Sequence, residues 1–174
     1  KIPVVRWLMD WIGAIPVHKP EDHMGKTSNE AMFSSCYAAL AEGHPLLIFP
    51  EGITRDDPSI APVKTGAARI ALGARAEGSS NIQILPVGIH YEDKAALRSK
   101  VFVNAGLPID LDEAVERHGF SHDATPENRD LVEAITQEIE LYLRRVSPNF
   151  ADWHEARALT DAADVTLRSE GPAP

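Results

Sequence analysis

Apolar residues recur at the three-to-four-residue spacing of a helix in several stretches of the chain. The clearest stripe predicts a helix over 126–146 and consists of Leu131, Ile135, Ile139, Tyr142 and Val146. Thr125 is expected to cap this helix, and Pro126 suits its first position because proline lacks the N–H that is unpaired there. Two arginines in its last turn complement the negative end of the helix dipole.

Two further helices are expected nearer the N-terminus. The first carries Trp7 and Trp11 on one side, which faces either the core or a membrane interface. The second begins at Thr27, where Glu30 has capping-box spacing, and ends before Gly43. Both assignments place apolar side chains on one face of the helix.

Strand patterns alternate with these helices. Short apolar or alternating runs predict strands over 14–17, 45–49, 81–91 and 100–105. The second run is wholly apolar, as expected for a strand covered on both faces, and the small side chains over 66–74 predict a helix packed close to the sheet. This order predicts an α/β fold with a mainly parallel or mixed central sheet flanked by helices.

Charge is distributed unevenly along the 174 residues, whose formal net charge is −9. Residues 1–106 carry 11 acidic and 11 basic side chains, whereas 107–174 carry 15 acidic and 6 basic ones. We therefore expect an α/β domain over 1–147, an acidic C-terminal tail over 148–174, and no nucleic-acid partner. The single cysteine, Cys36, permits no intrachain disulfide and no cysteine-based zinc site, and a place in a helix core is expected for it.

Candidate chemistry concentrates in the polar loop that follows the most apolar run. Glycine, hydroxyl and cationic groups that could present N–H donors and positive charge to a phosphate stand at Gly52, Thr54, Arg55 and Lys64. Glu51 is suited either to accept hydrogen bonds from a polyol hydroxyl or to hold one of the cations in place. Taken residue by residue, an ordinary surface loop with solvated charges is the alternative interpretation.

The run Phe49-Pro50-Glu51-Gly52, with Lys64 and Gly66 downstream, resembles the third signature block of the glycerophospholipid acyltransferases. The segment from Gly13 to Lys19 resembles the second block, and that from Ile84 to Gly88 resembles the fourth, in the family's order. The resemblance covers roughly residues 7–108. It is closest to the fungal-type glycerol-3-phosphate/dihydroxyacetone-phosphate acyltransferases and their bacterial relatives.

This resemblance implies transfer of an acyl chain from acyl-CoA or acyl carrier protein to a hydroxyl of glycerol 3-phosphate or a lysophosphatidic acid. It implies that Lys19, Arg55 and Lys64 position the phosphate, that Glu51 binds the glycerol backbone, and that no metal or prosthetic group is needed. Lys19 stands where the family usually has arginine, so the charge is kept but the two-pronged geometry is lost. The resemblance also implies a location on the cytoplasmic side of a membrane, peripheral or anchored upstream of Lys1.

The family's first block, a histidine and an aspartate separated by four residues, supplies the catalytic base and should precede the second block. Residues 1–17 contain no histidine, so the fold is expected to be incomplete at its N-terminus and the isolated segment to be inactive. The same spacing between His118 and Asp123 is interpreted as a coincidence in a polar turn. His18 adjoins Lys19 and either faces the phosphate or is a structural histidine. The alternative function is a non-catalytic phosphate- or lipid-binding domain of the same fold.

Overall fold

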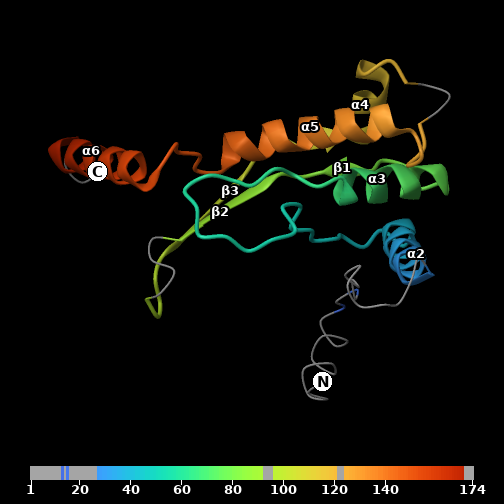
Figure 1. The fold of residues 1–174 in the computed structure, drawn as a ribbon, viewed down its shortest axis with the longest axis horizontal. Coiled ribbons are helices and arrows are strands. Elements are labelled where there is room, and N and C mark those ends of the chain that lie inside the picture. The colour runs from blue at the N-terminus through green and yellow to red at the C-terminus, as the bar shows by residue number, and fades with distance from the viewer. Residues whose placement is uncertain (1–12, 14, 16–26, 92–95, 121–123, 171–174) are drawn as a thin grey trace.

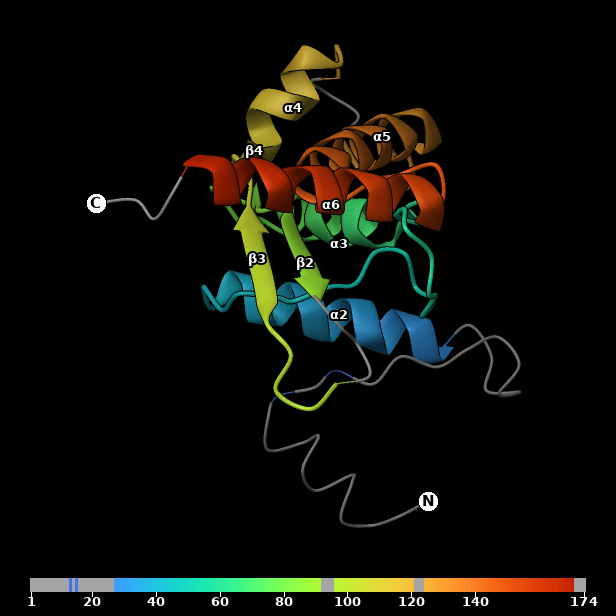
Figure 2. The ribbon, with the colours of Figure 1, turned by 90° about the vertical axis from the view of Figure 1, so that its left-hand side faces the viewer.

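Helices form most of the structure, a computed structural model that describes residues 13, 15, 27–91, 96–120 and 124–170. Figures 1 and 2 show α3 (Gly66–Ala76) lying between α2 (Thr27–Ala41) on one side and α5 (Arg129–Val146) on the other. The helix predicted around Trp7 lies outside the described residues, as does most of the strand predicted over 14–17.

Helix α2 confirms the helix predicted from Thr27, and its end has the expected physical cause. Gly43 has a φ of 79°, a left-handed conformation that glycine adopts without steric cost. This turn lets the N–H of Gly43 bond the carbonyl of Leu40 at 3.0 Å, and that of His44 bond the carbonyl of Ala39 at 2.9 Å. Cys36 is buried in this helix as expected, and burial raises the pKa of its thiol.

Helix α3 is present as predicted, but its small side chains serve helix packing rather than close packing on a sheet. A Cβ at Gly73 would lie 2.1 Å from the hydroxyl oxygen of Tyr37 in α2, so only glycine permits this approach. The opposite side of α3 contributes Ala68, Ala71 and Leu72 to the main hydrophobic core. Close approach of the two helices accounts for the glycine better than the predicted helix–sheet contact does.

Helix α5 carries the predicted apolar stripe into the core, with Leu131, Ile135 and Ile139 buried. It begins three residues later than the predicted first position. Asn128 is its N-cap, because the Asn128 side chain accepts a hydrogen bond from the N–H of Leu131 at 3.1 Å. The expected cap at Thr125 is therefore wrong, and its carbonyl accepts the N–H of Asn128 in the preceding turn.

The described strands form two separate antiparallel pairs, so the predicted parallel arrangement is wrong for this part of the chain. β1 (Gln83–Ile84) pairs with β4 (Ile109–Asp110), and β2 (Val87–Tyr91) pairs with β3 (Val101–Ala105). The connection between β2 and β3 is only nine residues long, too short for the crossover that parallel pairing needs, so a hairpin results. Pro86 separates β1 from β2, which places it at a strand end, where its missing N–H costs no ladder bond.

Two segments differ from their predicted structure. Residues 45–49 form no strand, and the Leu47 and Phe49 side chains are 81% and 70% exposed rather than covered. The acidic segment after residue 147 contains the helix α6 (Trp153–Glu170), which lies beyond the C-terminal end of α5 in Figure 1. Asp152 caps this helix by accepting hydrogen bonds from the N–H groups of His154 and Glu155 at 2.8 Å, a start signal that the prediction of a tail overlooked.

The short helix α4 (Leu111–Arg117) completes the core between β4 and α5. Asp110 caps it by accepting hydrogen bonds from the N–H groups of Asp112 and Glu113 at 3.0 and 3.1 Å. Ala114 and Val115 then pack among the buried side chains of α3 and α5. The core is thus built mainly by helices, with Ile109 of β4 at its edge.

Candidate functional site

The candidate site is the loop over residues 50–64, here called the site loop, whose two ends meet. The N–H of Lys64 donates to the carbonyl of Pro50 at 2.8 Å. The N–H of Gly52 donates to the carbonyl of Phe49 at 3.1 Å, which forms a tight turn at the start of the loop. These bonds bring the glutamate-glycine pair and the downstream lysine together, although a dozen residues separate them in the sequence.

Lys64 lies directly against the turn at Gly52. A Cβ at position 52 would be 3.0 Å from both Cδ and Nζ of Lys64, and the φ of Gly52 is 63°, in the left-handed region. Glycine is required here for two reasons, because any side chain would strain the backbone and displace the lysine. The structure therefore places the Lys64 ammonium group directly against this backbone turn.

Glu51 spans the site loop. Its Oε2 atom accepts a hydrogen bond from the N–H of Ala61 at 2.6 Å, in a partly buried position. This contact holds the far part of the loop near the turn. One of the two carboxylate oxygens is thus used to shape the loop.

The other predicted site residues lie further along the loop. Arg55 forms an ion pair with Asp57, and both side chains are partly exposed. Thr54 is exposed, and Lys19 lies outside the described residues. Within the described residues, the structure brings together Glu51, Gly52 and Lys64, and it gives Arg55 a carboxylate partner of its own.

A contact that the sequence did not reveal attaches the site loop to α5. The N–H of Val63 donates to Oε2 of Glu140 at 3.2 Å, while Oε1 of Glu140 accepts from Arg144 at 2.8 and 3.0 Å. The Arg144 guanidinium, together with the Val63 N–H, lowers the pKa of the Glu140 carboxyl. The spacing of Glu140 and Arg144 indicates a helix-surface pair, but nothing in it points to Val63.

Replacing Glu140 by glutamine is expected to destabilise the protein by about 1 kcal/mol at neutral pH, because a charge-assisted contact is lost. The folded-state pKa of Glu140 is lowered, so this stabilisation is present above the unfolded-state pKa and disappears as the pH falls through the folded-state value. Thermal unfolding measured across the acidic range should show the difference between parent and variant shrinking. A difference that grows on acidification would contradict the assignment.

The histidine-aspartate spacing near α4 has a structural role in the described residues. His118 Nε2 lies 2.9 Å from Oε2 of Glu138, and Arg117 pairs with the other oxygen of the same carboxylate. These contacts join α4 to α5, in keeping with the interpretation of a polar turn, while Asp123 lies outside the described residues. Among the described side chains, no group of three or more histidine, cysteine or acidic residues could hold a metal ion.

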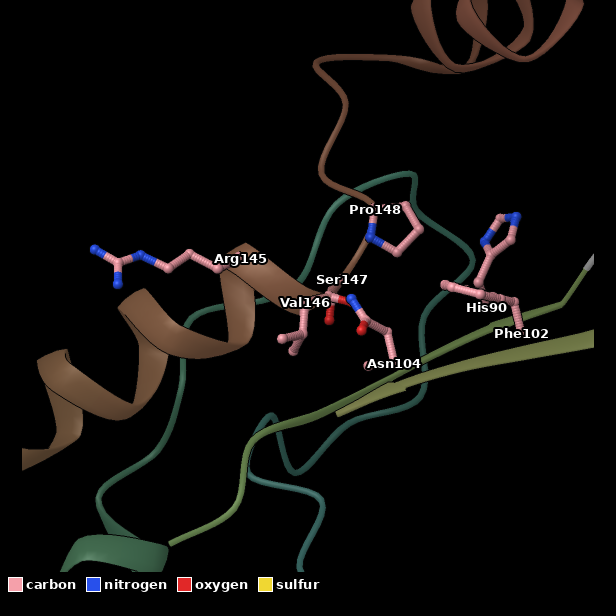
Figure 3. A pocket seen from close by; sticks show the side chains of 8 residues that line it. His90, Phe102, Asn104, Arg145, Val146, Ser147 and Pro148 are labelled. Atoms are coloured by element: carbon pink, nitrogen blue, oxygen red, sulfur yellow. The ribbon is translucent and has the colours of Figure 1, made fainter. Parts of the chain in front are cut away.

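A hollow of about 250 Å³ lies at the end of α5, and no residue of the site loop lines it (Figure 3). His90, Phe102 and Asn104 line it from the β2–β3 hairpin, and residues 146–148 line it from the other side. Arg145 belongs to the same lining, but Figure 3 shows its guanidinium pointing away from His90 and Phe102. No predicted site residue lines this hollow.

The sequence of this chain is similar to those of known acyltransferases. The Acyltransferase family matches residues 1–90. Glycerol-3-phosphate O-acyltransferase 2 of Saccharomyces cerevisiae is 32% identical over 74% of this chain, and glycerol-3-phosphate O-acyltransferase 1 of the same yeast is 30% identical over 75% of it. An uncharacterized acyltransferase of Schizosaccharomyces pombe is 32% identical over 41% of the chain.

The matched region spans 17% of the length of each of the two Saccharomyces relatives and 11% of the Schizosaccharomyces one. No solved structure matches the chain significantly. The family match includes the site loop and the start of the β2–β3 hairpin. The chain therefore belongs to the acyltransferase family, as its resemblance to the glycerophospholipid acyltransferases predicts.

Proposed function

We propose that the site loop binds the phosphorylated acceptor in an acyltransferase of glycerolipid synthesis. The reaction moves an acyl chain from acyl-CoA or acyl carrier protein to a hydroxyl of glycerol 3-phosphate or a lysophosphatidic acid. One observation carries the proposal: the Lys64 ammonium group lies against the Gly52 turn, in a loop that the Glu51 carboxylate holds together through the N–H of Ala61. Two relatives named glycerol-3-phosphate O-acyltransferases support the choice of acceptor.

The cationic residues bind the phosphate end of the acceptor, and the glutamate binds its glycerol end. Lys64, with Arg55 and Lys19, neutralises the phosphate, while Glu51 accepts a hydrogen bond from a glycerol hydroxyl through the oxygen that does not bind Ala61. Arg55 must leave Asp57 to reach a phosphate, so acceptor binding competes with that ion pair. Thr54 supplies a hydroxyl, and Gly52 supplies the turn against which Lys64 lies, since its own N–H is bound to the Phe49 carbonyl.

The chemical step needs a base that the printed sequence does not provide before the second block. The acceptor hydroxyl attacks the thioester carbonyl, its proton passes to the base, and the thiol of the donor leaves. We place this base on a histidine, oriented by an aspartate, outside residues 1–174. Since general-base catalysis contributes roughly 100- to 10,000-fold, residues 1–174 alone should bind the acceptor with little or no turnover.

Calorimetric titration with glycerol 3-phosphate tests the site without requiring catalysis. The variant Lys64→Gln is expected to weaken binding roughly 10- to 100-fold, since a hydrogen bond to a charged group contributes about 1.5–3 kcal/mol. Lys64→Arg should keep part of the affinity. Arg157→Gln, which removes an exposed cation on α6, should keep all of it.

Two outcomes would overturn the proposal. One is binding that survives Lys64→Gln, and the other is equal affinity for glycerol and glycerol 3-phosphate. If binding follows the proposal but a longer polypeptide containing the histidine-aspartate block gives no acyl transfer, the non-catalytic binding domain is the correct function. A radiolabelled acyl-transfer assay on that polypeptide therefore separates the two functions.

We further propose that the enzyme works at the cytoplasmic side of a membrane, because both its acyl donor and its product carry long apolar chains. No described helix combines the length and apolar composition that a bilayer crossing requires. Contact with lipid through the described residues would then depend on surface side chains. The distribution of exposed apolar residues identifies one such surface.

A further inference from the structure

The β2–β3 hairpin is fixed at one end and uncovered at the other. At the fixed end, Gly88 packs against the backbone of Val146, and the Asn104 side chain donates to the Val146 carbonyl at 3.4 Å. Gly106 closes this end by donating its N–H to the carbonyl of Pro86 at 2.9 Å. Figures 1 and 2 show the opposite end projecting away from α3 and α5.

The projecting end carries large apolar side chains that are between 43% and 93% exposed. We call residues 89–91 and 96–103 the hairpin tip. Cross-strand pairing places four of its exposed apolar residues on one face of the ladder, namely Ile89, Tyr91, Val101 and Val103. Phe102, which is 66% exposed, lies on the other face, and Leu97 in the connecting turn is 93% exposed. Phe102 pairs with His90, and both line the hollow at the end of α5, so the apolar surface of the tip is the first face together with Leu97.

The turn at the end of the tip presents Leu97 and a cation together. The N–H of Ser99 donates to the carbonyl of Ala96 at 3.3 Å, so Leu97 and Arg98 are the central residues of this turn. Arg98 has a φ of 65°, the left-handed conformation expected at the third position of a type II turn. Arg98 and Lys100 are both exposed beside the apolar side chains.

The charge of the tip is opposite to that of the rest of the protein. Residues 89–91 and 96–103 contain two cations and no carboxylate. Even with residues 92–95 included, the sequence over 87–105 has three cations and two carboxylates, whereas the remaining residues have 14 cations and 24 carboxylates. An acidic protein thus places a basic, apolar tip at its periphery.

We propose that the hairpin tip docks on an anionic lipid surface. Leu97, with Tyr91 and Val101 of the last ladder pair, would enter the interface between headgroups and acyl chains, while Arg98 and Lys100 would lie at the level of the phosphates. Two observations favour lipid over a second copy of the chain. The most exposed apolar side chain, Leu97, lies in the turn and not on a face of the ladder, which suits insertion rather than face-to-face pairing, and two basic tips would repel one another.

Docking would deepen the proposed function by holding the enzyme at the surface that receives its product. The benefit to product release rests on the proposed function, but lipid binding by the tip does not. It can be measured with neither acyl donor nor glycerol 3-phosphate present. Failure of one proposal is therefore distinguishable from failure of the other.

Flotation with vesicles tests the proposal on residues 1–174. The protein should bind vesicles of phosphatidylcholine mixed with phosphatidic acid more tightly than vesicles of phosphatidylcholine alone. Leu97→Glu should weaken binding to the mixed vesicles roughly tenfold or more, because an apolar contact is lost and a negative charge is added. Arg98→Gln should weaken it several-fold and reduce the dependence on phosphatidic acid.

Matched variants on α6 provide the controls. Leu159 is 51% exposed, so Leu159→Glu adds the same charge at a similar kind of position, and Arg157→Gln removes the same kind of cation. Both should bind mixed vesicles like the parent. Lys64→Gln should also retain vesicle binding while losing affinity for glycerol 3-phosphate.

Circular dichroism establishes whether Leu97→Glu keeps its fold, and sedimentation velocity measures its oligomeric state. The exposure of Leu97 predicts no change in helical content. The proposal is wrong if the parent does not bind mixed vesicles, or if the α6 variants lose binding as strongly as the tip variants. It is also wrong if Leu97→Glu breaks a dimer while vesicle binding is unaltered, since the tip would then be a contact between copies.

Discussion

Gly88→Ala is expected to destabilise the protein by about 2–3 kcal/mol or more, the usual cost of overpacking where backbone must move. A Cβ at this position would lie 2.1 Å from the carbonyl oxygen of Val146 and 2.7 Å from its carbonyl carbon. Both atoms belong to backbone, so rotation of a side chain cannot relieve the collision. Either β2 or the end of α5 must shift, and the anchor of the hairpin to α5 is lost.

Urea unfolding followed by circular dichroism measures this effect, and Gly66→Ala provides the matched control. A Cβ at Gly66, the first residue of α3, meets nothing within 4 Å. That variant should be neutral or stabilised by up to about 1 kcal/mol, since alanine restricts the unfolded chain. Equal unfolding midpoints for the two variants would show that β2 does not pack on Val146 in solution.

The helices were largely predictable because their signals are local. In α5, the helical spacing of Leu131, Ile135 and Ile139 predicted the helix. In α2, the glycine that follows the helix predicted its end. No contact with a distant part of the chain changes either feature. The beginning of α5 was not predictable in the same way. Thr125 and Asn128 are both good N-caps, and their local chemistry does not decide between them. The structure uses Asn128.

The strands were less predictable because pairing depends on partners far away in the sequence. The apolar run over 45–49 predicted a strand covered on both faces, yet Leu47 and Phe49 are exposed and have no ladder. An apolar run indicates that burying the segment would lower the free energy, but it does not show which other element would cover it. The short connection between β2 and β3 was visible in the sequence and argues for a hairpin, a signal that the general alternation of helices and strands obscured.

In the candidate site, too, local features were predictable and long-range contacts were not. The resemblance grouped Glu51, Gly52 and Lys64, and the structure brings these residues together through the turn and the closure of the loop. The link from Val63 to Glu140 joins residues 77 positions apart, so no local pattern contains it. The same resemblance also grouped Arg55 with Lys64, but Arg55 pairs with Asp57 and Lys19 lies outside the described residues. The contacts that hold the site loop on α5 follow from packing alone.

Leu131→Ala is expected to destabilise the protein by about 2–5 kcal/mol, the range for removing a large aliphatic side chain from a packed core. Leu131 is 0% exposed and lies among the buried residues of α3, α4 and α5. Because helices build this core, the loss should appear as a lower midpoint of the whole helical transition in thermal unfolding. The site loop is attached to the same helix through Glu140, so its affinity for glycerol 3-phosphate should fall only where the fold itself melts.

Leu141→Ala makes the same chemical change on the same helix, at a side chain that is 49% exposed. It should cost less than about 1 kcal/mol, because little apolar area returns to water and alanine favours the helix. A comparable loss in both variants would mean that α5 buries a different face from the one described. A large loss for Leu131→Ala alone places the stability of this acyltransferase chain in its helical core. The exposed apolar segments at 45–49 and in the hairpin tip would then be available for contacts beyond the fold.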